Sequence, residues 1–333
     1  MTLAASDKPL HDVYDLAMLD LDGVVYLGAN AIDGAADALA TAKAAGMTLA
    51  YITNNAARPA RAVAEHLREL GMPDVRDADV VTSAQAVARL VAEAVPAGSR
   101  VLVVGGEGLR VPLQEQGLVC VSSLDDEPAA VVQGFHPEVG WKALAEASYA
   151  IASGVPWFVS NTDMTVPTAR GVAPGNGSLV QAVRNATGAT PVVAGKPERA
   201  LFDETLARLQ GARPLMVGDR LDTDIDGAIN AGIDSLAVLT GVSTLQDVAE
   251  AQPGHRPSFV AADLSGLLVP HQEVQLGDGT ARCGDAVAHL EGDRLLVEGD
   301  PRSVPALRAA VALAWSVRDT SGTKVRLDGM MKA

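Results

Sequence analysis

The clearest pattern in the chain is a short apolar run that ends in two carboxylates and a glycine. Residues 16–19 are apolar, and Asp20, Leu21, Asp22 and Gly23 follow them directly. Such a run, closed by a glycine, is typical of a buried parallel strand that ends in a tight turn. Because open α/β sheets bind their ligands at the carboxyl ends of the strands, we expect Asp20 at such an end and Asp22 in the turn. An Asp-x-Asp pair can also be a plain turn or a helix cap, so its meaning depends on the rest of the chain.

Apolar strands and amphipathic helices alternate in the segments that follow. Residues 35–45 predict a helix, residues 47–53 a strand and residues 60–70 a second helix. A strand, a helix and a strand in this order form a βαβ unit, which favours a parallel sheet. The same pattern resumes at residues 215–218, an apolar run that ends in Asp219. These segments predict one α/β domain that is interrupted in sequence.

A second αβ pattern fills the interruption. It predicts helices and strands at residues 84–94, 101–104, 130–133, 142–153 and 157–160. A loop rich in glycine and proline then covers residues 161–178, and a loop of this length inside a compact protein is usually functional. We therefore expect a core domain of residues 1–82 and 185–269, with residues 83–184 inserted as a cap domain.

The pattern changes near residue 270. Residues 277–300 alternate between apolar and polar positions as in a β-hairpin, and residues 304–317 have the spacing of an amphipathic helix. We expect a small C-terminal α+β domain of residues 270–333. The apolar face of its helix must be covered by the hairpin, by the core or by a second subunit, which leaves a homo-oligomer open.

Composition and charge exclude several classes of protein. The chain has 333 residues, and its net charge of −15 argues against non-specific nucleic-acid binding and against anionic membranes. No apolar stretch approaches the roughly 20 residues that span a bilayer, and the N-terminus lacks the pattern of a secretory signal. The two cysteines are far apart and lack metal-ligand spacing, so neither a disulfide nor a zinc site is expected. We expect a soluble cytoplasmic protein whose local positive groups hold any anionic substrate.

Polar residues follow the predicted strands, or begin a predicted helix, at four places in the chain. A parallel sheet would bring these places together at its carboxyl edge. The residues are Asp20 and Asp22; Thr53, Asn54 and Asn55; Lys196; and Asp219, Asp222 and Asp224. The set contains the groups that phosphoryl transfer requires: a carboxylate nucleophile, carboxylates for a metal ion, and donors for phosphate oxygens.

The carboxylates fit covalent, metal-assisted chemistry. Asp20 can attack phosphorus to form an aspartyl-phosphate, and Asp22 can serve as general acid and then as general base. Mg²⁺ prefers hard oxygen ligands, which Asp20, Asp219 and the backbone carbonyl of Asp22 can provide. The metal would reduce the repulsion between a carboxylate nucleophile and a phosphate dianion.

Hydrogen-bond donors and positive charge are expected around the phosphate. The Thr53 hydroxyl and the backbone N–H groups at Thr53 and Asn54 can hold its oxygens, with Asn55 in the same turn. Lys196, predicted at a helix N-terminus, adds its charge and a favourable dipole. In the cap, Asp163 is the best candidate for the site, because its long loop should return toward the core. The alternatives are that residues 53–55 are ordinary turn residues and that Lys196 is a solvated lysine, and the other motifs beside them argue against both.

Four short motifs in this order resemble the signature motifs of the haloacid dehalogenase superfamily. They are DLDG from Asp20, TNN from Thr53, GKP from Gly195 and GDRLDTD from Gly218. The cap and its loop resemble the subclass of nucleotide, p-nitrophenyl phosphate, phosphoglycolate and glycerol-phosphate phosphatases. The segments VVTSAQ, VVQG, APGNGS and VLTGV are most similar to actinobacterial glycerol-3-phosphate phosphatases. The resemblance implies an α/β fold with a Rossmann-like core and an inserted C2-type cap, and Mg²⁺-dependent hydrolysis of glycerol 3-phosphate.

The resemblance also implies a role for each motif residue. Asp20 would be the nucleophile and Asp22 the acid and base, and the Thr53 hydroxyl would bind phosphate. Lys196 would stabilise charge and Asp219 would bind the metal. The last motif contains two further acidic residues. Asp224 would be a second metal ligand or would support the site from behind the ligands, whereas Asp222 matches no family role.

Several alternatives stay open on this resemblance. The substrate could be another small ester, such as 2-phosphoglycolate, an aryl phosphate or a nucleotide. The chain could also be a phosphotransferase or mutase, or a non-catalytic module that binds a phosphate ligand. In the cap, His136 and Trp141 could touch substrate or lie at the surface. The C-terminal domain resembles part of an acetyltransferase fold, but it lacks a glycine-rich phosphate loop, so we expect it to be non-catalytic.

Overall fold

The computed structural model describes residues 2–168 and 170–327 and divides into two compact units. Unit 1 comprises Met1–Ala50, Leu70–Pro73 and Gly211–Ala333, and unit 2 comprises Tyr51–Glu69 and Asp74–Gln210. In the described part of the chain, no helix combines the length and the apolar character that a bilayer crossing needs.

A parallel sheet in the order β16-β15-β14-β2-β5-β6 begins in unit 1. Its strands are β2 (Leu16–Leu19), β5 (Thr48–Thr53), β6 (Val80–Thr82), β14 (Pro214–Gly218), β15 (Asp234–Val238) and β16 (Phe259–Ala261). The end of β5 and all of β6 belong to unit 2. All four residues of β2 are buried, as in a parallel strand covered on both faces, so the expected apolar run is confirmed.

Short elements complete this part of unit 1. They are α1 (Leu10–Val13), α2 (Ala35–Ala44), α9 (Asp226–Ala231), α10 (Leu245–Ala249), a π-helical turn (Leu221–Ile225), a 3₁₀ helix (Leu264–Leu268), and the strand pairs β1 (Ser6–Pro9) with β17 (Pro270–His271) and β3 (Tyr26–Leu27) with β4 (Asn30–Ala31). The expected helix at residues 35–45 is therefore present as α2.

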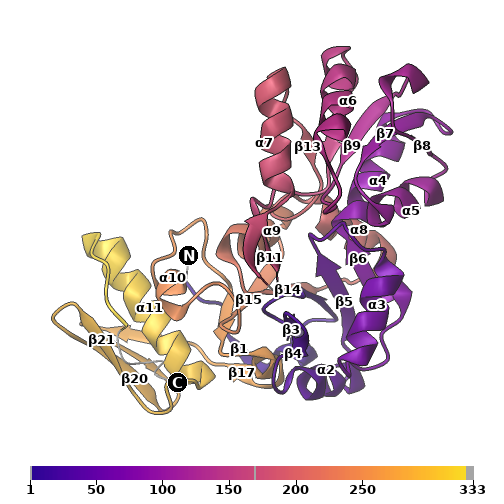
Figure 1. The fold of residues 1–333 in the computed structure, drawn as a ribbon. Helices are drawn as coiled ribbons and strands as arrows, with labels where there is room; N and C mark the ends of the chain where they lie inside the picture. Colours follow the sequence, from indigo (N-terminus) through magenta and orange to yellow (C-terminus); the bar gives the residue numbers. More distant parts are fainter. Residues whose placement is uncertain (1, 169, 328–333) are drawn as a thin grey trace. The chain divides into compact units, whose positions relative to one another are not determined.

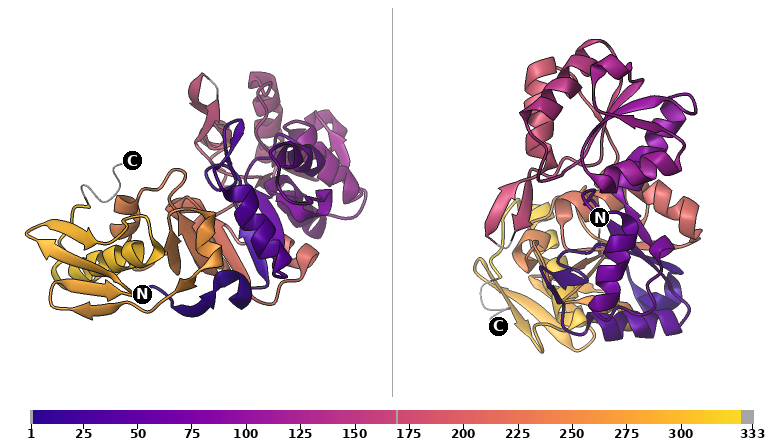
Figure 2. Two further views of the ribbon diagram at one scale, coloured as in Figure 1. Left: turned by 90° about the horizontal axis from the view of Figure 1, so that it is seen from below. Right: turned by 45° about the vertical axis from the view of Figure 1, so that its right-hand side comes forward.

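The C-terminal segment of unit 1 is an antiparallel sheet covered by one long helix. Its strands, in spatial order, are β18 (Gln275–Gly277), β19 (Thr280–Cys283), β20 (Ala286–Glu291) and β21 (Arg294–Glu298). Helix α11 (Val304–Ser321) lies along one face of this sheet (Figures 1 and 2). The predicted hairpin and helix are both present, with two further strands.

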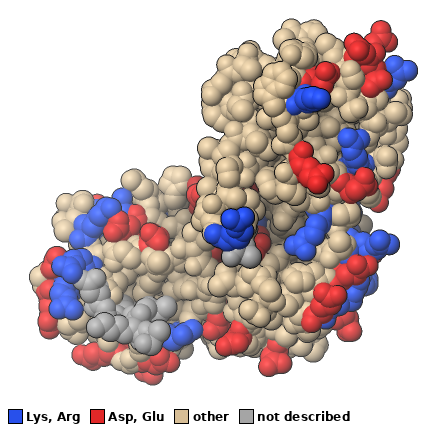
Figure 3. All heavy atoms as spheres, in the orientation of Figure 1, with Lys and Arg blue, Asp and Glu red and all other residues tan. Residues whose placement is uncertain are grey.

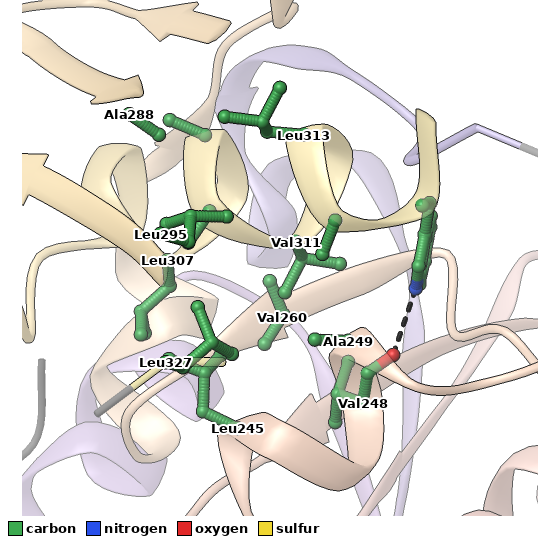
Figure 4. Packing of buried hydrophobic residues seen from close by; sticks show 14 of the residues in the cluster. Leu245, Val248, Ala249, Val260, Ala288, Leu295, Leu307, Val311, Leu313 and Leu327 are labelled. Carbon is green, nitrogen blue, oxygen red and sulfur yellow. Dashed lines mark hydrogen bonds between the residues drawn. The ribbon is translucent and has the colours of Figure 1, made fainter. Parts of the chain in front are cut away.

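Helix α11 also packs against the parallel sheet. Leu307, Val311 and Trp315 share one buried apolar cluster with Val260 of β16 and Val248 of α10 (Figure 4). The C-terminal segment therefore has no separate core, because its helix completes the core of unit 1.

Unit 2 contains a second parallel sheet in the order β13-β10-β9-β7-β8. The strands are β7 (Arg100–Val104), β8 (Val119–Val121), β9 (Ala130–Gln133), β10 (Trp157–Val159) and β13 (Val192–Val193). The helices are α3 (Ala60–Glu69), α4 (Ser83–Ala94), α5 (Glu107–Glu115), α6 (Trp141–Ala152), α7 (Asn176–Thr187) and α8 (Ala200–Leu209), with two 3₁₀ turns at Asp77–Asp79 and Leu124–Asp126. Helices α6 and α7 stand side by side and share an apolar cluster with this sheet (Figure 1).

Two expectations for unit 2 are wrong in detail. The segment 161–178 is not one irregular loop, because it contains the hairpin of β11 (Thr165–Thr168) and β12 (Gly171–Pro174) and the first turn of α7. Helix α8 begins at Ala200, so Lys196 precedes it rather than standing at its first turn. Residues 195–199 form bends and turns instead of the predicted first helical turn.

Candidate active site

The ends of two neighbouring strands bring the first carboxylates of unit 1 together. Leu19 of β2 lies opposite Val217 of β14, and the Asp20 N–H donates to the Val217 carbonyl at 2.9 Å. Because the strands are parallel and in register here, Asp20 and Asp219 leave the sheet at the same edge.

Three carboxylates gather at this edge. One carboxylate oxygen from each of Asp20, Asp219 and Asp224 lies within 4.8 Å of the other two. Asp219 is 2% exposed and Asp224 is fully buried. Like charges held this close in a buried place are unfavourable unless a cation shares the site. A set of hard oxygen donors fits Mg²⁺, so these residues could hold the metal.

Backbone donors fix the two buried carboxylates. Asp224 Oδ2 accepts the N–H groups of Asp219 at 3.1 Å and Arg220 at 3.0 Å. The π-helical turn Leu221–Ile225 carries Asp224 into this position. Asp219 Oδ2 accepts the Val242 N–H at 2.6 Å, from the loop after β15. The orientation of both side chains is thus set by the main chain.

Two glycines make room for the Asp219 carboxylate. A Cβ atom on Gly23, whose φ is +84°, would lie 2.5 Å from Asp219 Oδ2, and one on Gly241 would lie 2.0 Å from it. Any other residue at either position would collide with the carboxylate. Thr240 ties the two segments together, because its hydroxyl donates to the Gly23 carbonyl. Gly241 and Thr240 were not expected from the sequence, where VLTGV gave only a likeness to relatives.

Asp22 and Asp222 lie outside the three-carboxylate group. Asp22 is exposed in the turn after β2, where the Gly23 N–H donates to the Tyr26 carbonyl at 2.8 Å. Asp222 forms a two-pronged ion pair with Arg220, at 3.0 and 2.7 Å. The hydrogen bonds from Arg220 lower the pKa of the Asp222 carboxyl. Asp222 thus has a structural partner, which agrees with its having no expected catalytic role.

Asn54 lies at the centre of a group of polar residues in unit 2, which comprises Thr53, Asn54, Asn55, Asp163 and Lys196. Its Oδ1 accepts the Lys196 N–H at 2.8 Å, and its Nδ2 donates to the Lys196 carbonyl at 3.0 Å and to Asp163 Oδ2 at 3.1 Å. The Asn54 carbonyl accepts from Ser83 Oγ and Asn161 Nδ2, both at 2.6 Å. The side chain of Asn54 is thus fully used in holding other residues.

The neighbours of Asn54 differ in exposure. Thr53 is 5% exposed, and its hydroxyl accepts the Asn55 N–H at 3.0 Å. Asn55 itself is exposed, and its Oδ1 accepts the Ala57 N–H. Lys196 is 3% exposed, so it is not the solvated lysine of the alternative interpretation. Residues 53–55 form a turn with side-chain hydrogen bonds, whose backbone is ordered by Asn54.

The long loop of unit 2 is held by amides and glycines. Asn176 Nδ2 donates to the Asn161 carbonyl at 2.7 Å, and the Gly177 N–H donates to the Asp163 carbonyl at 2.8 Å. A Cβ atom on Gly177 would lie 2.2 Å from the Thr162 carbonyl oxygen. This frame delivers Asp163 to Asn54. The supporting roles of Asn161 and Asn176 were missed, although both stand among the glycines that marked the loop.

The sequence-predicted residues therefore form two groups. Asp20, Asp219 and Asp224 belong to unit 1, together with the exposed Asp22. Unit 2 holds the others, which are Thr53, Asn54, Asn55, Asp163 and Lys196.

Comparison with known proteins agrees with this arrangement of motifs. The family model for haloacid dehalogenase-like hydrolases matches residues 17–119, and a second HAD-hydrolase-like model matches residues 193–267. The chain is 46% identical over 269 residues to D-glycerol 3-phosphate phosphatase of Mycobacterium tuberculosis, which covers 81% of this chain and 74% of the relative. It is 38% identical to acid sugar phosphatase of Staphylococcus aureus, over 71% of this chain and 90% of the relative.

Solved structures share the fold. A glycerol phosphate phosphatase from Mycobacterium tuberculosis in complex with magnesium has a TM-score of 0.81 at 39% identity, covering 93% of this chain and 92% of that one. A 4-nitrophenylphosphatase from Thermotoga maritima has a TM-score of 0.72 at 30% identity, covering 78% of this chain and 98% of that one. The expected α/β fold class is confirmed by these likenesses.

Proposed function

The chain belongs to the haloacid dehalogenase-like hydrolase family, and we propose that it hydrolyses glycerol 3-phosphate to glycerol and phosphate. It is an Mg²⁺-dependent phosphoric monoester hydrolase. The choice of substrate is supported by the 46% identity to a relative that is named for D-glycerol 3-phosphate. The structural observation that carries the proposal is the group of three carboxylates at the edge of the parallel sheet.

The proposed metal site uses the carboxylates of unit 1. Asp20, Asp219 and Asp224, with the backbone carbonyl of Asp22, would hold Mg²⁺. When bound, Mg²⁺ neutralises the repulsion between a carboxylate nucleophile and a phosphate dianion. The backbone donors on Asp219 and Asp224 hold both carboxylates in a fixed orientation before substrate arrives.

The proposed reaction has two steps. A carboxylate oxygen of Asp20 bonds to phosphorus while the bond from phosphorus to the glycerol oxygen breaks. Asp22 donates a proton to that oxygen, so that glycerol leaves as a neutral alcohol. The Asp22 carboxylate then takes a proton from water, and the water oxygen attacks phosphorus and releases Asp20 together with phosphate. The exposure of Asp22 suits exchange of this proton with solvent.

We propose that the polar group of unit 2 serves the same phosphoryl transfer. The Lys196 ammonium would neutralise charge on the phosphate oxygens, and the Thr53 hydroxyl and the N–H groups of the turn would donate to them. The order of the four motifs and the family support joining the two groups. Asn54 acts as a positioning residue in this account, because its side chain is occupied by Lys196 and Asp163.

The same proposal assigns a role to each of the three expected domains. Residues 1–82 and 185–269 would act as the catalytic core, residues 83–184 as a cap that selects the substrate, and residues 270–333 as a non-catalytic support. On the face drawn in Figure 3, basic and acidic side chains are interspersed, which supports a small substrate rather than nucleic acid as partner. We further propose a cytoplasmic location, consistent with two free cysteines.

A phosphate-release panel tests the proposal. Purified protein with Mg²⁺ should have its highest kcat/KM on glycerol 3-phosphate, above glucose 6-phosphate, 2-phosphoglycolate, a nucleotide and p-nitrophenyl phosphate. Glucose 6-phosphate is included because an acid sugar phosphatase is among the relatives. A higher kcat/KM on the sugar phosphate would reassign the substrate. Binding without phosphate release on every ester would favour the non-catalytic module.

A further inference from the structure

A cavity of about 300 Å³ lies beside the five-stranded sheet of unit 2. Its apolar side is formed by residues such as Leu102 and Val104 of β7 and Val139 and Ala143 near the start of α6. Its polar side comes from the ends of three strands and the start of α5. None of the residues that line it belongs to the groups assigned to hydrolysis.

The strand order places this cavity at a topological switch point. In the order β13-β10-β9-β7-β8, the chain leaves β7 for β8 on one side and later returns to β9 on the other side. The connections after β7 and β9 therefore diverge, and open α/β sheets bind ligands in the crevice between such connections. The cavity is lined by both connections, through Gly106 after β7 and His136 after β9.

The polar side of the cavity is suited to an anion. Arg110 on α5 lines it and is partly buried, and no described carboxylate pairs with its guanidinium. Other arginines of this acidic chain, such as Arg76 and Arg256, have aspartate partners. Charge without a partner at the wall of a cavity favours a ligand of opposite sign.

His136 and the start of α5 add hydrogen-bond donors. His136 Nδ1 accepts the Glu138 N–H at 3.3 Å, so its Nε2 carries the hydrogen and can donate. The histidine ring packs over Gly106, where a Cβ atom would lie 2.3 Å from His136 Cδ2. Gly106 caps α5 without a side-chain hydrogen bond, which leaves the helix N-terminus to other acceptors. Glu138, exposed on the same wall, disfavours a second negative group.

We propose that this cavity binds a small organic anion, as a ligand site separate from the site of hydrolysis. A single phosphate or carboxylate group would lie between Arg110 and His136, and an apolar portion would lie on Leu102, Val139 and Ala143. The volume is at the lower end for ligand sites, which fits a ligand the size of an aromatic acid rather than a nucleotide.

Calorimetric titration of the full chain tests the site. The probes are phenylphosphonate and benzoate, added in excess chelator to the Lys196→Ala protein, in which the proposed phosphoryl site is impaired. At least one probe should bind with a stoichiometry of one, and the two probes distinguish a phosphate-type from a carboxylate-type ligand. Arg110→Ala in this background should weaken binding by about tenfold or more, because it removes a charge-assisted contact.

Two further variants complete the design. Ala143→Leu keeps every charge but fills the apolar side, and it should also weaken binding, which keeps the test valid if Arg110→Ala does not fold. Arg184→Ala removes an exposed arginine of α7 that does not line the cavity, and its affinity should equal that of the parent. The proposal would be overturned if neither probe binds. It would also be overturned if the parent and both cavity variants bind the probe with equal affinity.

Discussion

Asn54 and Lys196 are joined by a reciprocal pair of hydrogen bonds, although 142 positions separate them in the chain. The Asn54 side chain accepts the Lys196 N–H and donates to the Lys196 carbonyl, and both residues are at least nine-tenths buried. An amide side chain is the simplest group that can satisfy a donor and an acceptor of one residue at once. The backbone at Lys196 is therefore held by the second motif of the chain.

Asn54→Ala should lower both stability and turnover. The substitution leaves the Lys196 N–H and carbonyl without their partner in a buried place, which costs about 1–3 kcal/mol of unfolding free energy. If Asn54 positions Lys196, kcat should fall by about 10- to 100-fold with KM changed less. Denaturant unfolding and steady-state kinetics measure the two effects. The exposed neighbour provides the control: Asn55→Ala should change stability by less than about 0.5 kcal/mol. Wild-type kcat in a folded Asn54→Ala protein would remove its positioning role.

Asp224 and Asp222 should differ in their effect on Mg²⁺ binding. Asp224→Ala removes one of three clustered carboxylates and the acceptor of two backbone N–H groups, so affinity for Mg²⁺ should fall by about tenfold or more, with a loss of stability. Asp222→Ala removes only an ion pair with Arg220, so affinity should stay within about twofold. Calorimetric titration with Mg²⁺ compares the variants. Equal losses would mean that the ion pair is part of the metal site.

Local sequence signals predicted the elements that carry the carboxylates. The apolar run before Asp20 and the run before Asp219 define β2 and β14, and their parallel pairing follows from the βαβ pattern. By contrast, α5 was not predicted, because Pro112 lies inside it and breaks the expected periodicity. Short-range patterns of apolar and polar residues therefore predicted most of these elements. They did not predict α5, a helix with an internal proline that is stabilised by its packing in unit 2.

Contacts between distant segments could not be predicted. No local signal shows that the Asn54 side chain hydrogen bonds to Lys196 and Asp163 rather than to substrate. These hydrogen bonds depend on how three loops that are distant in sequence pack together. The same applies to Gly241, whose missing side chain makes room for Asp219. The shared core of α11 and the parallel sheet was also invisible, because an amphipathic helix shows that it must be covered but not by what.

Asp20→Asn should abolish hydrolysis while keeping the fold. The amide has the same shape but cannot attack phosphorus, so kcat should fall by about 10³-fold or more. Removing one of three clustered negative charges relieves repulsion in the metal-free protein, so the melting temperature without Mg²⁺ should be unchanged or higher. Single-turnover phosphate release and calorimetry measure these effects. A variant with near-normal turnover would reassign the nucleophile.

Stability should fall in mild acid because of His271. Burial lowers the pKa of His271 to about 4 from its ordinary 6.5, and its Nε2 hydrogen bonds to the Gly266 carbonyl. Since the folded-state pKa lies below the unfolded-state value, the unfolded chain binds more protons between them. The contribution of His271 is complete above pH 6.5 and is lost as the pH falls toward 4, by up to about 3 kcal/mol.

Urea unfolding at several pH values checks this. His271→Gln should lower stability at pH 7 but flatten the decrease between pH 6.5 and 4 relative to the parent chain. The comparison of the two slopes matters, because other groups also titrate in this range. Parallel slopes would show that His271 does not carry the acid sensitivity.

The packing of the C-terminal segment, residues 270–327, should depend most on Trp315. It is 3% exposed, its Nε1 donates to the Val248 carbonyl at 2.8 Å, and the Arg256 guanidinium lies 4.7 Å from its ring centroid (Figure 4 shows the hydrogen bond). Trp315→Ala should lower the unfolding free energy by about 3–5 kcal/mol, through lost burial and an orphaned carbonyl.

The chain offers a matched control for this substitution. Trp141 is 76% exposed on α6, so Trp141→Ala should change stability by less than about 0.5 kcal/mol.

Because Ile225, next to Asp224, belongs to the same apolar cluster as Trp315, loosening of this core should also weaken Mg²⁺ binding at temperatures near the transition. Well below the transition, phosphate release per folded Trp315→Ala molecule should stay close to that of the parent, since no proposed ligand or nucleophile lies in residues 270–327. Full stability in Trp315→Ala would contradict a shared core, and complete loss of hydrolysis in a folded Trp315→Ala protein would give the C-terminal segment a part in the reaction.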